Sequence, residues 1–255
     1  MTTSTPTLTY GSYLRLDRLL TLQHPLADRP GTEEELFIAV HQVHELWFRQ
    51  LLTELAAARD RMLAGQPREA RLLLHRCSEI DRALLATIEL LDTMAPAAFL
   101  DFRGALGSAS GAQSAQFLEV ELLSGPAAPE RLAGLDWPTR AERSRLQRRL
   151  REPNLWDAFL TVLATAGHQV LTADQRRAAL VATVRDPAGA ELVDLAEALL
   201  DHDQGWALWR ARHVLVVERQ IGRRSGTGGS SGATHLADLA RGRFYPELWE
   251  FRSRL

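Results

Sequence analysis

The chain has 255 residues, of which 45% are hydrophobic and 24% charged, and its formal net charge is −2. This balance is typical of a globular protein and excludes a disordered tail, a collagen-like fibre and a disulfide-stapled miniprotein. The small net charge provides no global field for nucleic acid or anionic lipid. All 30 basic side chains are arginine, so a Schiff-base lysine and a P-loop lysine are both excluded.

Helical periodicity dominates the chain, and strand patterns are almost absent. A long helix is predicted to open at Thr32, with a capping box to Glu35, and to run to Gly65. The later predicted elements are a long helix from Pro67 to near Pro96, short helices around 99–106 and from 111 to about 123, an Arg-rich helix within 125–153, helices near 154–166 and 172–184, a long helix from about 189 to 222, and two short closing helices. Because no repeat or linker divides the chain, we predict one all-α domain of long packed helices over residues 1–255, with 1–9 disordered.

Cys77 is the only cysteine, which excludes an intrachain disulfide and a cysteine-based zinc site. It lies in a helical pattern with Leu73, Leu74 and Ile80, so we predict that it is a small core residue. No stretch approaches the roughly 18 apolar residues of a membrane span, and the N-terminus lacks the basic and apolar blocks of a signal peptide. We therefore expect a cytoplasmic protein.

Two histidine-containing helix faces are candidates for chemistry. His41, His44 and Glu45 lie on one side of a predicted helix, in a spacing that is not the zinc-protease pattern. A core histidine is the simpler interpretation, although a polar group on an aromatic wall also suits a pocket for a flat apolar ligand. His213 shares a face with Trp206 and Trp209, which suits an axial haem ligand or, alternatively, a buried histidine that a backbone carbonyl satisfies.

Three further segments carry charge or glycine. Arg103, beside Phe102, could clamp a carboxylate or pair with Asp101. The glycine- and serine-rich run at 225–232 follows a helix and lacks lysine, so it is neither a dinucleotide fingerprint nor a Walker loop; an anion-binding nest and a flexible surface loop both stay open. The Arg-rich segment at 140–151 contains acidic residues and no stacking aromatics, which favours a solvated helix face over a nucleic-acid site.

Several of these motifs stand in one order along the chain. They are Tyr10-Gly-Ser-Tyr13, the stretch from Phe37 to Phe48 around His41, Phe102-Arg103 before a Ser-Ala-Ser-Gly turn, Trp209 to His213, and Gly226 to Gly232 followed by Phe244-Tyr-Pro-Glu-Leu. In this order they resemble the tryptophan 2,3-dioxygenase family. The resemblance implies an all-helical fold that encloses a haem b pocket, a homotetramer, and a place in tryptophan catabolism through the kynurenine pathway.

The resemblance also implies roles for individual residues. His213 would be the proximal ligand of the haem iron, with Trp209 and Gly228 also at the cofactor. His41 would hydrogen-bond the indole N–H, Arg103 would clamp the substrate carboxylate, and Thr227 would contact the amino and carboxylate end. The substrate pocket would be lined by Phe37, Phe99, Leu106 and Ser110, while Tyr10 and Tyr13 would reach into a neighbouring subunit's site.

The implied reaction inserts both atoms of O2 across the indole C2–C3 bond of L-tryptophan and gives N-formyl-L-kynurenine. His41 would mainly orient the ring, because the indole N–H is too weak an acid to need a general base, and the glycine run would close over the substrate.

Three residues, Ala112, Ala115 and Leu118, depart from the Phe, Leu and Arg usual in the family. We expect them to adjoin the pocket rather than to form it, and haem binding to be unaffected. A haem monooxygenase acting on L-tryptophan or a methylated tryptophan therefore stays open. A haem sensor or a helical scaffold without turnover is the alternative outside enzymes.

Overall fold

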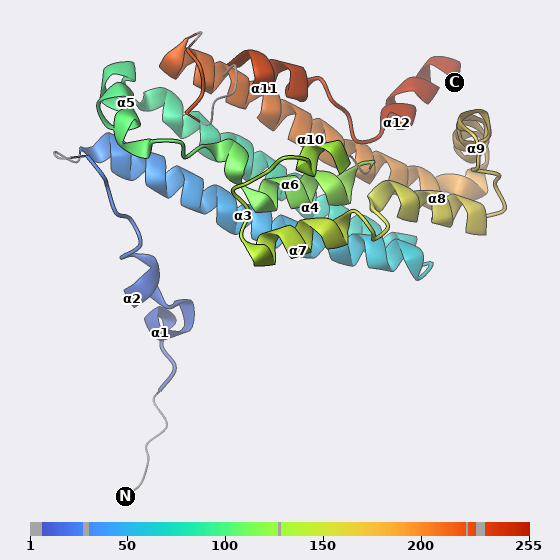
Figure 1. The fold of residues 1–255 in the computed structure, drawn as a ribbon. Coiled ribbons are helices and arrows are strands. Elements are labelled where there is room, and N and C mark those ends of the chain that lie inside the picture. The colour runs from blue at the N-terminus through green and yellow to red at the C-terminus, as the bar shows by residue number, and fades with distance from the viewer. Residues whose placement is uncertain (1–6, 28–30, 127–128, 223, 228–232) are drawn as a thin grey trace, which may run out of the picture.

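The computed structural model describes residues 7–27, 31–126, 129–222, 224–227 and 233–255 (Figure 1). Its body is built on three long helices, α3 (Thr32–Leu63), α4 (Pro67–Glu89) and α10 (Ala190–Ile221). Because α4 packs along both α3 and α10, it forms the centre of the bundle. At 1.5 Å per residue, the 32 residues of α3 and of α10 each make a rod of about 48 Å.

Shorter helices cover these three: α6 and α8 pack on α3, α7 packs on α6, and α11 packs on α10. The shorter helices are α1 (Tyr10–Leu14), α2 (Leu16–Leu19), α5 (Pro96–Arg103), α6 (Ala115–Ser124), α7 (Arg140–Arg149), α8 (Leu155–Thr165), α9 (Ala173–Arg185), α11 (Ala233–Ala240) and α12 (Pro246–Glu250). The described residues contain no strand, which confirms the predicted all-α class. Within them no single helix is long and apolar enough to cross a membrane; only the pair 67–93 and 96–106, bent by 93°, meets that criterion together.

Most predicted boundaries agree with the structure within a few residues, but the start of α3 does not have the predicted cap. The N-cap is Gly31, no side chain caps the helix, and Thr32 is the first helical residue, so the predicted capping box is wrong. The helix predicted from 111 opens with a 3-10 turn at Gly111–Gln113, and α6 begins only at Ala115. Helices α1 and α2 were not predicted, because five and four residues are too few to give a helical period.

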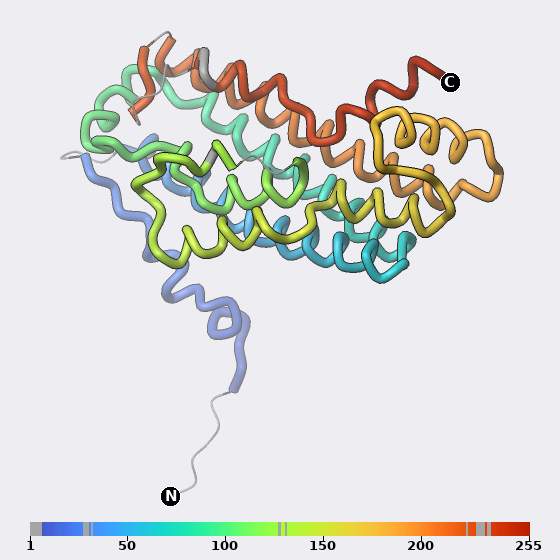
Figure 2. The backbone as a smooth tube through the Cα atoms, turned by 45° about the vertical axis from the view of Figure 1, so that its right-hand side comes forward, coloured from blue at the N-terminus to red at the C-terminus, as the bar shows by residue number. Residues whose placement is uncertain are grey.

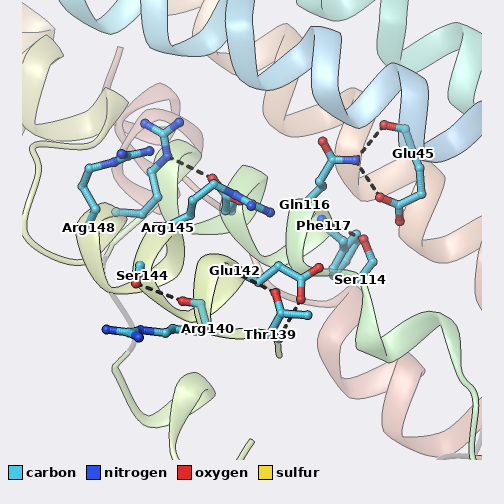
Figure 3. Close-up of polar contacts among 12 residues, drawn as sticks. Glu45, Ser114, Gln116, Phe117, Thr139, Arg140, Glu142, Ser144, Arg145 and Arg148 are labelled. Atoms are coloured by element: carbon cyan, nitrogen blue, oxygen red, sulfur yellow. Dashed lines mark hydrogen bonds and ion pairs between the residues drawn. The ribbon is translucent and has the colours of Figure 1, made fainter. Parts of the chain in front are cut away.

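The Arg-rich helix α7 is only partly the solvated face that the sequence favours. Arg145 donates to Oε1 of the buried Glu119 at 2.8 Å, and Nε of Arg149 lies 3.6 Å from Oε2 of the same carboxylate. The N-terminus of α7 is closed by a capping box between Thr139 and Glu142 (Figure 3). The arginines of this helix therefore fasten α7 to α6 as well as facing solvent.

The core lies mainly where α4 meets its neighbours, and Cys77 is buried there as predicted. A Cβ at Gly205 of α10 would lie 2.8 Å from the Cβ of Asp81 on α4, so glycine permits the close approach of these helices. The large side chains with less than 2% exposure include Leu51, Leu55, Leu74, Leu84, Leu163 and Trp206.

A buried polar chain joins α4, α6 and α10. Nδ1 of His202 lies 2.8 Å from Oδ2 of Asp81, and Nε2 of His202 lies 2.9 Å from Oγ of Ser124. All three residues are at most 1% exposed. This Ser-His-Asp arrangement could not be argued from the sequence, because its members lie 78 and 121 residues apart. Since no substrate can reach a fully buried hydroxyl, we interpret the chain as a structural cross-link.

Replacing His202 by Ala should destabilise the fold by about 3–5 kcal/mol, because the Asp81 carboxylate would lose its buried partner. Burial already raises the pKa of Asp81, so its charged form depends on that partner. Urea unfolding measures the change. The control is His75→Ala at an exposed position on α4, which should shift stability by less than about 0.5 kcal/mol. Equal losses in the two variants would contradict the structural assignment.

The N-terminal segment stands apart from the bundle. In both views it runs outward from the start of α3, with α1 and α2 distant from the other helices (Figures 1 and 2). No residue of α1 or α2 is buried, and Tyr10 and Tyr13 are 77% and 70% exposed. These two tyrosines therefore do not contribute to a site within their own chain.

Candidate functional site

A cavity of about 360 Å³ lies between α3, α6, α10 and α11. Its walls are mostly apolar or aromatic, and three imidazoles face it from two helices: His41 and His44 from α3, and His213 from α10. The remaining lining residues are Glu45, Phe48, Ile88, Gly111, Ala112, Ser114, Phe117, Leu118, Leu135, Trp209, Arg210, Leu236 and Leu239. The fold thus brings together the two histidine faces that the sequence singled out separately.

His213 is a neutral imidazole without a hydrogen-bond partner in the described part of the chain. Burial, followed by the neighbouring His41 and His44, lowers its pKa to about 4. Its ring lies 5.2 Å from the Trp209 ring, centroid to centroid. The predicted alternative of a histidine satisfied by a backbone carbonyl is therefore not observed. A neutral imidazole with free ring nitrogens is the form that binds a metal.

No group of three or more His, Cys, Asp or Glu residues that could hold a bare metal ion occurs among the described residues. A metal at His213 would therefore have to bring most of its own ligands. An iron porphyrin does so, and it needs from the protein an axial imidazole and an apolar wall. His213 and Trp209 supply those two features.

His41 offers an acceptor to the same cavity. Its Nδ1 lies 2.7 Å from the carbonyl oxygen of Phe37, which can only accept a hydrogen bond. Burial lowers the pKa of His41, although the Phe37 carbonyl and Glu45 act in the opposite direction. The neutral ring therefore carries its proton on Nδ1, and the lone pair of Nε2 is left for an N–H donor.

Glu45 is the acidic member of the cavity lining, and a side chain from α6 holds it. Nε2 of Gln116 donates both to the Glu45 carbonyl oxygen at 2.9 Å and to Oε2 of its carboxylate at 2.7 Å (Figure 3). This contact fixes the carboxylate one helical turn beyond His41. Because Glu45 raises the pKa of His41, Gln116 helps to set the charge balance beside the acceptor.

The predicted aromatic wall continues from His41 toward the start of α3. The Phe37 ring lies 4.1 Å from the His41 ring, 5.8 Å from Phe99 and 5.4 Å from Phe102, centroid to centroid. Leu106 is half-buried and packs against the same core. Phe37, Phe99 and Leu106 do not line the 360 Å³ cavity, and Phe37 contacts it through the His41 ring.

Arg103 and Thr227 come together, but in a different hollow from that of His213. They line an open pocket of about 420 Å³ with Leu100, Gly104 and Gly107. Nη2 of Arg103 donates to the carbonyl oxygen of Ser225 at 2.5 Å, and no ion pair with Asp101 is observed among the described residues. Thr227 Oγ1 donates to the carbonyl oxygen of Ala109 at 2.5 Å. These two bonds fasten the start of the glycine-rich run to the last residue of α5 and to the turn after it.

The turn before α6 and the first residues of α6 hold the three residues that depart from the family pattern. Ser110 caps the 3-10 turn at Gly111–Gln113 through a capping box with Gln113. Ala112 and Leu118 line the cavity, so the expectation that they merely adjoin it is wrong. Ala115 is buried in a second hydrophobic cluster with Leu118, Leu122 and Leu146. Gly228 lies outside the described residues, as do residues 229–232.

His44 and Trp209 form a contact that the sequence did not predict. Trp209 Nε1 donates to His44 Nε2 at 3.2 Å, across 165 residues of chain. The spacing of His41 and His44 placed both histidines on one side of α3, but nothing in the sequence identified the partner on α10.

The buried imidazole of His44 predicts an acid-sensitive fold. Burial lowers its pKa to about 4 from an ordinary value of 6.5, against a backbone contact with Val40 that raises it. Between these values the unfolded chain binds a proton that the folded chain does not, so the free energy of unfolding should fall as pH falls from about 6.5 to about 4. Urea midpoints measured across this window should fall less steeply for His44→Gln. They should be unchanged in slope for His75→Gln, and a wild-type slope in His44→Gln would contradict the assignment.

The fold and the site define an all-helical protein with an apolar cavity that two histidine-bearing helices enclose. The model of the family "Tryptophan 2,3-dioxygenase" matches residues 1–153 and 151–255. A tryptophan 2,3-dioxygenase of Nocardioides sp. is 50% identical over 256 residues, covering 97% of this chain and 95% of the relative. Those of Herpetosiphon aurantiacus and Caulobacter vibrioides are 40% and 38% identical, each covering 97% of this chain and 98% of the relative. The chain belongs to the tryptophan 2,3-dioxygenase family, which is haem-dependent.

Proposed function

We propose that the chain cleaves the indole C2–C3 bond of L-tryptophan with O2 to give N-formyl-L-kynurenine, using a haem b bound at His213. The observation that supports the proposal is that one cavity is lined both by His213, which has no hydrogen-bond partner among the described residues, and by the acceptor His41 on a different helix. The near full-length identity to named tryptophan 2,3-dioxygenases supports the same activity.

The residues around His213 fit a haem. The imidazole is neutral and has no partner among the described residues, and the indole of Trp209 forms an apolar wall beside it. When bound, the haem supplies activation of O2, which the side chains of the protein cannot provide. The protein's part is to bind and orient the substrate and to keep water away.

An amino acid with an indole ring needs an acceptor for its N–H, an aromatic wall and a cation for its carboxylate. His41 offers the acceptor at Nε2, and Phe37 and Phe99 extend the wall. Arg103 would provide the cation: its bond to the neutral Ser225 carbonyl would be exchanged for a stronger bond to a charged carboxylate. Thr227 lies beside Arg103 and would contact the amino and carboxylate end.

The assignment requires the hollow of Arg103 and the cavity of His41 to act as one site when tryptophan is bound. The turn that accepts the Thr227 bond at Ala109 connects them, since Gly107 lines the hollow and Gly111 lines the cavity. Exchange of the Arg103 bond to Ser225 for one to the substrate carboxylate would release Ser225 at the start of the glycine-rich run and let the run close over the substrate, a gating role. The haem contact of Gly228 remains part of this proposal.

A homotetramer is also proposed. Tyr10 and Tyr13 are exposed on a segment that runs away from its own bundle, so in an assembly they would reach the site of a neighbouring subunit. A cytoplasmic location remains a prediction.

Optical titration of the haem-loaded protein with L-tryptophan tests substrate binding. We expect the Soret band to shift with saturating L-tryptophan, because the substrate would occupy the cavity beside His41. D-alanine, which lacks the indole, should leave the band unchanged. A Soret band that does not respond to L-tryptophan would favour a haem-binding scaffold without turnover.

A further inference from the structure

One hydrogen bond links the two helices that carry the cavity histidines. Trp209 on α10 donates from Nε1 to Nε2 of His44 on α3 at 3.2 Å. Otherwise α3 and α10 are held at a distance by α4, which packs along both. Within the described ranges no other side-chain hydrogen bond or ion pair joins α3 to α10.

The chemistry of the two side chains fixes the direction of this bond. An indole N–H can only donate, so Nε2 of His44 must accept. Nδ1 of His44 lies 2.8 Å from the Val40 carbonyl oxygen and carries the ring proton that this acceptor requires. His44 and Trp209 are 5% and 6% exposed, so without His44 the Trp209 N–H would be left unsatisfied in apolar surroundings.

Trp209 transmits the constraint to His213. One side of its indole stacks on Trp206 at 5.5 Å with 26° between the rings, and His213 lies 5.2 Å away at 30°. Phe48 and Phe117 also pack on this indole, at 6.1 and 5.6 Å between ring centroids. Such ring contacts give the indole N–H no preferred partner, whereas the hydrogen bond to His44 fixes its direction.

We propose that His44 is a positioning residue: by accepting the Trp209 N–H, it fixes the indole against which the His213 imidazole packs, and so sets the position of that imidazole relative to the α3 wall. The role toward a haem ligand rests on the proposed function, whereas the hydrogen bond and its effect on Trp209 do not.

Four variants separate the hydrogen bond from simple packing. His44→Gln retains an acceptor oxygen, His44→Phe and His44→Leu remove the acceptor, and Trp209→Phe removes the donor. His75→Phe, at an exposed position on α4, is the matched control. Two readouts are taken on haem-loaded protein: the haem reduction potential and, in ¹⁵N-indole-labelled ferrous CO-bound protein, the Trp209 N–H signal. The absence of one signal in Trp209→Phe assigns the resonance among the six tryptophans.

Loss of the acceptor should move the Trp209 N–H signal upfield and speed its exchange with solvent about tenfold. The reduction potential should shift in the same variants and stay close to wild type in His44→Gln and His75→Phe. In the double variant His44→Phe/Trp209→Phe, the potential should move no further than in Trp209→Phe alone, because both changes break one bond.

An unmoved Trp209 signal in His44→Phe and His44→Leu would overturn the proposal, as would additive shifts of potential in the double variant. A merely structural role of His44 would lower Tm while leaving the potential unchanged, which also overturns it. If the chain bound no haem, the proposed function would fail, and the N–H signal of the haem-free protein would still decide whether His44 holds Trp209.

Discussion

Replacing His213 by Gly should lower haem affinity by more than about 100-fold, because loss of a partner that only orients a metal ligand already costs about 10- to 100-fold. In the structure this imidazole is neutral, lines the 360 Å³ cavity and has no hydrogen-bond partner among the described residues. Haem transfer to apomyoglobin measures the loss. Added imidazole should restore binding, because it can occupy the space that the side chain leaves.

The matched control is His41→Ala, which removes the imidazole that lines the same cavity from α3. It should leave haem affinity nearly unchanged and weaken L-tryptophan binding, because His41 faces the indole N–H in the proposed arrangement. If His41→Ala lost the haem and His213→Gly retained it, the two roles would have to be exchanged.

Replacing Arg103 by Leu should weaken L-tryptophan binding by about 2–5 kcal/mol, since a desolvated carboxylate would be left without its cation. Such a loss raises KM by roughly 30-fold or more. Arg103→Lys should be intermediate, because it keeps the charge but not the forked geometry of the guanidinium. Steady-state kinetics and optical titration measure both quantities.

Tryptamine, which lacks the carboxylate, sharpens the test of Arg103. Its affinity should change little between wild type and Arg103→Leu, so the variant should lose most of its preference for L-tryptophan. The control Arg82→Leu removes an arginine that pairs with Glu79 on an exposed face of α4, and it should leave KM unchanged. Equal weakening of both ligands by Arg103→Leu would show that Arg103 supports the fold instead of the carboxylate.

The helical bundle could be predicted because its evidence is local. The apolar period of α3, α4 and α10 extends over many turns, and glycine or proline marks most of their ends. The same periodicity placed His41, His44 and Glu45 on one side of α3, and His213 with Trp206 and Trp209 on one face of α10. The apolar periodicity does not show which of these helix faces meet in the folded chain.

The contacts that the sequence did not reveal are those between distant segments. His44 with Trp209, and His202 with Asp81 and Ser124, depend on how three helices are arranged around α4. The separation of the Arg103 hollow from the cavity of His41 and His213 depends on turns, whose residues follow no regular period. Ala112 enters the cavity wall because a capped 3-10 turn precedes α6, which the sequence presented as one continuous helix.

The proposed dioxygenation is tested most directly by the mass of the product formed from L-tryptophan and ¹⁸O2 by the ferrous, haem-loaded protein. We expect a ring-opened product that carries two labelled oxygen atoms. One labelled oxygen on an intact bicyclic skeleton would contradict it and would define a monooxygenase, with Ala112 in the cavity wall as the first residue to change.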